Sequence, residues 1–323
     1  FMIERLERGR WALEVGARAE QLRIEQLEPT APLRPTLVQF MHEPIDYELY
    51  SYSLGLEFSP GRHHTISFLV GNSARAPEVQ ELMSLGPHLA TRSYSIGALI
   101  RGLDEEGVLE PETFNSVDLG WRFEGIAGAL TVQAFLTEAD DFIYQLNTGI
   151  FYDLAEQFFR FNCVRIEECL PVYEYTQADA RLRGVEWQWQ LPPVRVARGQ
   201  LGFEIFGDFV RGRLADGEDL PRMPPLRAGL GANWVGRTIS TELRVTHATA
   251  QNRPGLNETS TASYTDLSGG VTFSPRRGGD GGFLFFVRGR NLLNQQIRSS
   301  TSFLRSFAPE PGRSIEAGLR FDF

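Results

Sequence analysis

Apolar and polar side chains alternate strictly along many segments of this chain. In the segment 226–234, an apolar residue occupies every even position and a glycine or polar residue every odd position. The segments 239–246, 266–273 and 315–323 follow the same period of two. Such alternation predicts β-strands with one apolar and one polar face, and about ten residues is the length at which a tilted strand crosses a bilayer.

Further alternating segments extend this pattern to most of the chain, with turn residues between them. On this criterion the sequence contains roughly thirteen strands. The nine additional segments are 1–6, 11–18, 50–58, 66–70, 117–124, 130–134, 173–191, 201–206 and 283–288. The alternation slips near Arg183-Gly184, which predicts a β-bulge at that point.

The connections between these segments are alternately short and long. Short links lie near residues 8–9, 59–62, 124–128, 190–193, 235–237 and 274–279, and long links near 25–46, 73–112, 145–172, 214–224, 248–263 and 294–311. A transmembrane barrel has tight periplasmic turns and long external loops. The sequence therefore predicts an all-β fold, a transmembrane antiparallel β-barrel with its long loops outside the cell.

The number of strands bears on domain organisation. Single-chain bacterial barrels have an even number of strands as a rule, whereas thirteen is odd and Phe1 already lies in a strand-like segment. We expect residues 1–323 to form a partial barrel domain, the C-terminal portion of a larger barrel, and the true N-terminus to lie upstream.

The amino-acid composition limits the kinds of molecule that this chain is expected to bind. The net charge is −9, which argues against nucleic acid. No run of about 18 apolar residues is present, so we expect no transmembrane helix. All 32 basic residues are arginine. Guanidinium groups suit the phosphates of outer-leaflet lipopolysaccharide, although the codon bias of a GC-rich genome accounts for the same composition more simply.

Two cysteines, Cys163 and Cys169, lie close together in a segment predicted to be a loop. A disulfide in an oxidising compartment fits this spacing. A thiol metal site is the alternative, but no second cysteine pair or nearby histidine completes it.

Several motifs resemble those of TonB-dependent outer-membrane receptors. Residues 291–294 (Asn-Leu-Leu-Asn), then Pro311-Gly312-Arg313 and a terminal aromatic strand, are similar to the end of such a receptor. Residues 74–82 and 109–120 resemble an external segment and a strand entry of the same family. The resemblance implies a barrel of about 22 strands filled by an N-terminal plug, which is absent from this chain. It also implies that a TonB energy-transducing complex acts on that plug to release a small ligand or metal ion inward.

A finer resemblance is to the zinc-uptake branch of these receptors, through residues 86–91, 171–180 and 302–304. It implies that His88 faces an external vestibule and helps to bind Zn²⁺. A zinc site needs about four donors, and Glu78 and Glu81 would join His88 if the loop folds back.

The remaining histidines are weaker candidates. His42 is the second candidate metal ligand, in a loop with Glu43 and Asp46. His63-His64 is expected to be a turn pair, and His247 to lie at the rim, without ligand roles. The predicted external loops are acidic, which would concentrate cations at the mouth of the barrel.

Catalytic motifs such as G-x-S-x-G, H-E-x-x-H and the P-loop are absent, so we expect neither an enzyme nor a resident cofactor. The sequence favours an active-transport receptor in the outer membrane of a Gram-negative bacterium. Zinc is the first expected substrate, and a siderophore or haem iron chelate is the alternative. Three alternative hypotheses come from other functional classes: a barrel enzyme, a passive porin and a soluble β-sandwich binding module.

Overall fold

The computed structural model describes residues 1–25, 44–102, 108–165, 167–275 and 282–322. Within these residues it contains one 17-stranded sheet and two short helices, α1 (Val79–Met83) and α2 (Ala98–Gly102). Thirteen of the strands form a continuous wall. They are β1 (Met2–Arg8), β2 (Trp11–Ile24), β3 (Ile45–Phe58), β4 (His64–Arg75), β7 (Glu112–Gly125), β8 (Gly128–Asp153), β10 (Cys169–Gln190), β12 (Gly199–Leu214), β13 (Arg227–Val235), β14 (Ile239–Ala248), β15 (Tyr264–Phe273), β16 (Gly282–Arg290) and β17 (Ser314–Asp322).

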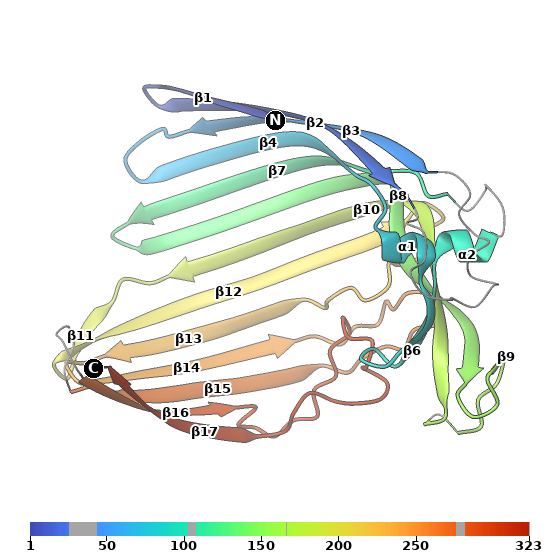
Figure 1. Ribbon diagram of the computed structural model, residues 1–323. Helices are drawn as coiled ribbons and strands as arrows, with labels where there is room; N and C mark the ends of the chain where they lie inside the picture. Colours follow the sequence, from blue (N-terminus) through green and yellow to red (C-terminus); the bar gives the residue numbers. More distant parts are fainter. Residues whose placement is uncertain (26–43, 103–107, 166, 276–281, 323) are drawn as a thin grey trace.

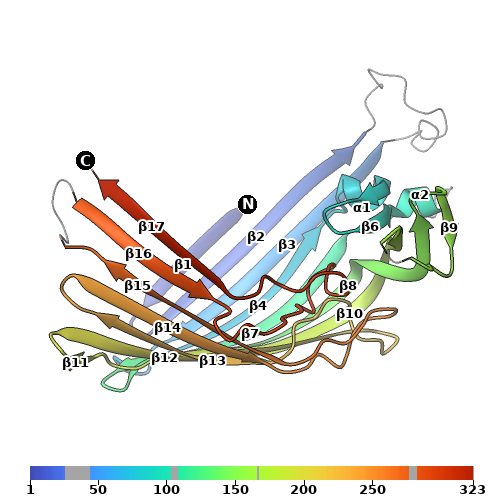
Figure 2. The same ribbon diagram turned by 90° about the horizontal axis from the view of Figure 1, so that it is seen from below.

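Each strand of the wall pairs antiparallel with the next one along the chain, as the sequence predicted. The four remaining strands are short pieces of the connections: β5 (Leu85–His88), β6 (Ser93–Ile96), β9 (Phe158–Arg160) and β11 (Val194–Val196). The sheet curves into a trough, seen from the side in Figure 1 and from below in Figure 2. The all-β barrel architecture is therefore confirmed.

One face of the wall is apolar and exposed. Leu13, Leu56, Phe68 and Leu119 lie side by side on successive strands in one cross-strand row. Each of them is at least 38% exposed. A row of large apolar side chains facing water would be strongly unfavourable, whereas acyl chains solvate it. This face is the one that the alternation assigned to lipid.

Aromatic side chains cluster at the end of the wall that carries the short turns. Trp11 stacks on Phe58 with ring centroids 4.1 Å apart. Trp189 donates its indole N–H to the carbonyl of Ala127 (3.0 Å), and Trp234 donates to Val196 (2.9 Å). Amphipathic rings with one satisfied N–H are typical of the interfacial girdle of a membrane barrel.

The predicted alternation of short and long connections is confirmed where the structure describes them, but the connection 145–172 is shorter than predicted. Residues up to Asp153 continue β8 and residues from Cys169 begin β10, so that the two strands project as a ribbon beyond their neighbours. Among the described residues, no helix has the length and apolarity that a bilayer span requires.

The bulge predicted near Arg183-Gly184 was wrong. These two residues pair regularly with Leu136 and Phe135 of β8. A side chain at Gly184 would collide with the ring of Phe135, which lies 2.5 Å from the Cβ position, so glycine there makes room for an aromatic neighbour. The register shifts instead between Pro171 and Tyr173 and between Ala178 and Ala180. At the second shift Asp141 of β8 adopts a φ of 56°.

Charge placed on the outward face is expected to destabilise the wall, whereas the same charge on the inner face is tolerated. Leu243 points outward, and Asn233 points inward at nearly the same depth, opposite Glu242. In the intact protein in lipid vesicles, Leu243→Arg should lower the free energy of unfolding by about 2–4 kcal/mol. Asn233→Arg is the matched control and should change it by less than about 1 kcal/mol. Equal losses in urea unfolding would contradict the assignment of the two faces.

Candidate ligand vestibule

The long connections gather at one end of the wall (Figure 1). We call them the loop layer, which comprises the described residues of 76–111, 154–168, 215–226, 249–263 and 291–313. Both helices and the strands β5, β6 and β9 belong to this layer. Any ligand that enters the trough from this end meets the loop layer first.

Arg75, the last residue of β4, holds helix α1 against the wall. Its guanidinium donates to Glu112 at the start of β7 (Nε to Oε2, 2.7 Å) and to Glu81 of α1 (Nη1 to Oε2, 3.0 Å). Glu81 also accepts the backbone N–H of Glu78 (2.7 Å) and so caps the helix. Paired guanidinium–carboxylate hydrogen bonds of this kind stabilise the contact and also fix the orientation of the two groups.

These contacts give a structural reason for two of the sequence motifs. The segment 74–82 supplies Arg75 and Glu81, and the segment 109–120 supplies Glu112. The two motifs are therefore parts of one hydrogen-bonded unit that positions the first loop of the vestibule.

The ribbon of β8 and β10 carries the second part of the vestibule. β12 ends beside Ala180, so the edge of β10 beyond it lacks a neighbour from the wall. β6 occupies that edge as a parallel strand, with Tyr94 opposite Val172. Tyr94 also packs on Tyr152 of β8 with ring centroids 4.4 Å apart. Pairing an exposed edge in this way satisfies its backbone groups.

A cavity of about 390 Å³ lies between these elements. Its lining combines aromatic, amide, hydroxyl and imidazole groups: Gln80, Ser84, Leu85, Gly86, Pro87, His88, Thr91, Ser95, Gln145, Tyr175 and Phe303. His88, which the resemblance placed at an external vestibule, is one of these lining residues. Seven of these eleven residues carry a polar side-chain group, and convergent polar groups orient a bound small molecule.

His88 is exposed at the end of β5, and its Nδ1 lies 2.9 Å from the hydroxyl of Thr91. Glu78 and Glu81 do not join it, because they cap α1 and bind Arg75. No group of three or more His, Cys, Asp or Glu side chains that could hold a metal ion occurs among the residues that the structure describes. His42 lies outside the described residues.

The other histidines have structural contacts. His63 lies 2.6 Å from the carbonyl of Glu124 through Nδ1, and His64 stacks on Trp121, both beside a short turn. His247 lies near the end of β14, with Nδ1 3.0 Å from the hydroxyl of Thr265. These positions agree with those expected from the sequence.

A buried ion triad ties three loops together behind the cavity. The side chain of Glu258 is 1% exposed, and its carboxylate lies 2.6 Å from the guanidinium of Arg305 and 3.8 Å from that of Arg222. Arg222 also lies over the ring of Phe303, 4.3 Å from its centroid. Because Phe303 lines the cavity, the triad supports one of its walls.

The triad carries two positive charges and one negative charge away from water. Burial lowers the pKa of Arg222 from its ordinary value, and the charge of Glu258 opposes that shift. The backbone carbonyl of Ser300 satisfies Arg305 further at 2.7 Å. Removing the single carboxylate would leave both guanidinium groups without a counter-charge.

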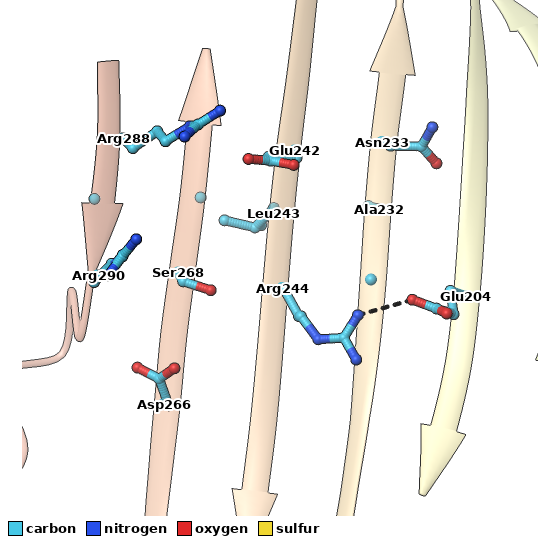
Figure 3. A pocket seen from close by; sticks show the side chains of 13 residues that line it. Glu204, Ala232, Asn233, Glu242, Leu243, Arg244, Asp266, Ser268, Arg288 and Arg290 are labelled. Atoms are coloured by element: carbon cyan, nitrogen blue, oxygen red, sulfur yellow. Dashed lines mark hydrogen bonds and ion pairs between the residues drawn. The ribbon is translucent and has the colours of Figure 1, made fainter. Parts of the chain in front are cut away.

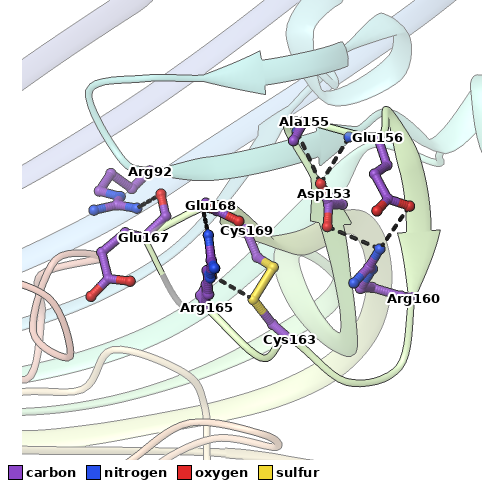
Figure 4. The surroundings of a disulfide bond; sticks show 10 residues. All are labelled: Arg92, Asp153, Ala155, Glu156, Arg160, Cys163, Arg165, Glu167, Glu168 and Cys169. Carbon is purple, nitrogen blue, oxygen red and sulfur yellow. Dashed lines mark hydrogen bonds and ion pairs between the residues drawn. A yellow bond between two sulfur atoms is a disulfide. The ribbon is translucent and has the colours of Figure 1, made fainter.

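The predicted disulfide joins Cys163 and Cys169 at the outer part of the loop layer (Figure 4). Nearby, Asp153 accepts the backbone N–H groups of Ala155 and Glu156 at 2.9 Å each. Arg92 donates to the carbonyl of Glu167 at 2.9 Å and thereby connects this loop to the segment that carries His88. The cysteines therefore have a structural role and are not free for a metal.

The inner face of the wall is charged and hollowed (Figure 3). A cavity of about 540 Å³ opens over β12 to β16, with Glu242, Asp266, Arg288 and Arg290 among its lining residues. Arg244 on β14 reaches across β13 to Glu204 on β12, with Nη1 and Oε2 2.9 Å apart. Gly231 lies between these two residues in the register, and the absence of its side chain leaves space for the contact.

Sequence reasoning missed the ion triad and the aromatic side of the cavity. Arg222, Glu258 and Arg305 are far apart in the sequence, in three loops without regular structure. Tyr175 and Phe303 likewise come from different elements. The acidity of the loops and the motifs at residues 86–91, 171–180 and 302–304 pointed to this region but not to these contacts.

Comparison with known proteins gives the family. A family profile described as "TonB dependent receptor-like, beta-barrel" matches residues 3–292. The chain belongs to the TonB-dependent receptor family. Members of this family are outer-membrane β-barrels and act as receptors and transporters, so the expectation that the chain is not an enzyme is confirmed.

Solved structures of TonB-dependent receptors share the fold at low sequence identity. The copper transporter OprC is 18% identical with a TM-score of 0.71, and the alignment covers 98% of this chain and 46% of that one. The FrpB iron transporter from Neisseria meningitidis (F3-3 variant) is 10% identical, with a TM-score of 0.60 and coverage of 98% and 43%. The siderophore receptor PirA from Acinetobacter baumannii is 14% identical, with a TM-score of 0.55 and coverage of 99% and 53%. The chain spans about half the length of these receptors, and none of the three is named for zinc.

Loss of the triad carboxylate is expected to loosen the loop layer. Glu258→Gln leaves Arg222 and Arg305 uncompensated and should make opening of this layer easier by about 3 kcal/mol or more. Hydrogen exchange of the segments 249–263 and 291–313 measures this opening. The matched control is Glu156→Gln, whose ion pair with Arg160 is exposed and worth less than about 1 kcal/mol. Unchanged exchange in Glu258→Gln would show that the triad does not hold the loops.

The disulfide is expected to act only locally. It closes a short loop, so its removal should ease the opening of residues 154–168 by about 2 kcal/mol. Limited proteolysis of the variant Cys163→Ser/Cys169→Ser should cut this loop faster, while the resistance of the wall to heat in detergent stays the same. Reduced heat resistance would indicate that the wall itself depends on the bond.

Proposed function

We propose that residues 1–323 form the later part of the barrel of an outer-membrane receptor that imports a metal ion or metal chelate by TonB-driven active transport in a Gram-negative bacterium. The main support for this function is that a loop-lined cavity and a charged, hollowed inner wall belong to one barrel of the TonB-dependent receptor family. The cavity supplies a place of recognition, and the inner wall supplies a wet surface along which a released ligand passes.

The proposal includes parts that lie outside this chain. The solved receptors are about twice as long, which supports an upstream plug and additional strands. A TonB complex in the inner membrane would act on that plug, and the wall would contact outer-membrane lipid and lipopolysaccharide. No resident cofactor is proposed, since the metal is cargo.

Zinc is the first substrate that we propose. The support is the imidazole of His88 in the wall of the cavity, together with the resemblance of residues 86–91 to the zinc-uptake branch. His88 needs further donors to make a complete zinc site. A plug or the segment that contains His42 would supply them.

An iron chelate, carried by a siderophore or haem, is the second candidate. The absence of a three-donor metal cluster from the described residues favours a ligand that brings its own coordination sphere. The aromatic rings of Tyr175 and Phe303 and the amides of Gln80 and Gln145 suit an organic chelate.

Binding by the full-length receptor distinguishes the two substrates. If zinc is the cargo, His88→Ala should weaken zinc binding in calorimetry by about tenfold or more. His63→Ala, at the opposite end of the barrel, is the control and should have no effect. Zinc affinity that is unchanged in His88→Ala would remove His88 from the site. Tight binding of haem or a ferric siderophore that is lost in Phe303→Ala would establish the second candidate.

A further inference from the structure

Four arginines form two directly opposed pairs on the outward face of the wall. Arg183 of β10 lies opposite Arg211 of β12, and Arg181 lies opposite Arg213. Like charges directly opposite each other on one face of a sheet destabilise the pairing. Two such pairs in succession indicate that the arginines bind an anionic group from outside the chain.

The four side chains continue the lipid-facing band. They share the parity of Val185 on β10 and of Phe209 on β12, which are among the exposed apolar residues. On β12 the outward apolar residues run from Leu201 to Phe209, and then Arg211 and Arg213 follow.

The depth of the cluster follows from the rise of the strand. Leu201 to Phe209 covers about 27 Å of strand, or about 20 Å of depth at a tilt of about 40°. An apolar band is about 25 Å tall. Arg211 and Arg213 therefore emerge at the level of the lipid headgroups, at the end of the wall that carries the loop layer.

The charges within the cluster do not balance. Glu138 pairs with Arg181 at 2.5 Å, and Asp219 lies 3.4 Å from Arg213 and 3.7 Å from Arg211. Among the described residues, four guanidinium groups thus share two carboxylates, and Arg183 has no acidic partner.

One donor in the cluster is also buried without an acceptor. The Nε of Arg211 is shielded from solvent and makes no hydrogen bond within the described part of the chain. A buried donor without a partner costs about 1–3 kcal/mol. Together with the charge excess, it indicates that an anionic ligand completes the site.

We propose that this cluster, Arg181, Arg183, Arg211 and Arg213, binds the phosphate groups of the outer-leaflet glycolipid, lipopolysaccharide. Guanidinium groups bind phosphate through paired N–H donors. The position beside the acyl-chain band selects a lipid headgroup, because the acyl chains of that lipid contact Val185 and Phe209 while its phosphates reach the arginines. The site rests on the outer-membrane location proposed above, but it is separate from the cavity of the transported ligand and does not depend on the identity of the cargo.

The test uses the full-length receptor in detergent with lipid A as the probe. Native mass spectrometry measures bound lipid A, and thermal unfolding measures the stabilisation that it gives. Arg183→Gln/Arg211→Gln should weaken binding by about tenfold or more. The same variant should unfold at a higher temperature than the wild type when no lipid is present, because an opposed like-charge pair is removed.

Matched controls separate the possible sources of an effect. Arg195→Gln/Arg237→Gln removes the same charge at the short-turn end and should leave lipid A binding unchanged. Dephosphorylated lipid A and inorganic phosphate should each stabilise the wild type much less than lipid A does. Binding of the metal or chelate should persist in Arg183→Gln/Arg211→Gln, so this test is independent of the transport proposal.

Three results would overturn the site. Lipid A binding that is equal in the variant and the wild type would place the lipid elsewhere. Equal stabilisation by dephosphorylated lipid A would show that only acyl chains are bound. Equal stabilisation by inorganic phosphate would show an anion site that does not recognise lipid.

Discussion

The hydrogen-bonded pairing of neighbouring strands, within a wall that meets lipid on one face and water on the other, governs this structure. In a bilayer every backbone N–H and C=O must find a partner in the chain, so each strand of the wall depends on the next. Each side chain of a paired strand then points either outward to lipid or inward to water. Leu13, Leu56, Phe68 and Leu119 point outward, while Glu204, Asn233 and Arg244 point inward.

Glycine makes this two-sided wall compatible with large side chains. Arg244 reaches Glu204 across Gly231, and Phe135 covers Gly184. On the outward face the ring of Trp187 lies against Gly207. A small residue on one strand thus gives space to a long side chain on its neighbour, and the barrel keeps its pairing without a bulge at these points.

The loop layer is stabilised by a different kind of interaction. Its segments have few strands, so charged contacts and aromatic packing hold them: Arg75 with Glu81 and Glu112, and Glu258 with Arg222 and Arg305. Such buried charges are costly unless every partner is present. They fix the shape of the cavity near His88 and Phe303, and shape is what ligand recognition at a barrel mouth requires.

The sequence predicted the wall well because period-two alternation is a local signal that lipid and water impose on every strand. Strand order and most loop lengths followed from it, and the disulfide followed from two cysteines six positions apart. The projecting ribbon at 145–153 was missed because both of its faces lie beyond the bilayer, where alternation is not required. The bulge was wrongly predicted near Arg183 because this arginine points outward, where the alternation requires an apolar residue. A polar residue at such a position looks in the sequence like a switch of the strand from one face to the other. The triad of Arg222, Glu258 and Arg305 could not be found, since its members are brought together only by the folding of three loops.

The central claim is that alternate residues of the wall contact lipid and water. Spin labels placed one at a time from Ile239 to Val245 on β14, in the full-length receptor in vesicles, test it most directly. Collision rates with lipid-soluble oxygen and with a water-soluble nickel complex should alternate with a period of two, oxygen being favoured at Thr241 and Leu243 and nickel at Glu242 and Arg244. Uniformly low collision rates with both reagents along the strand would indicate burial on both faces and would contradict the membrane wall.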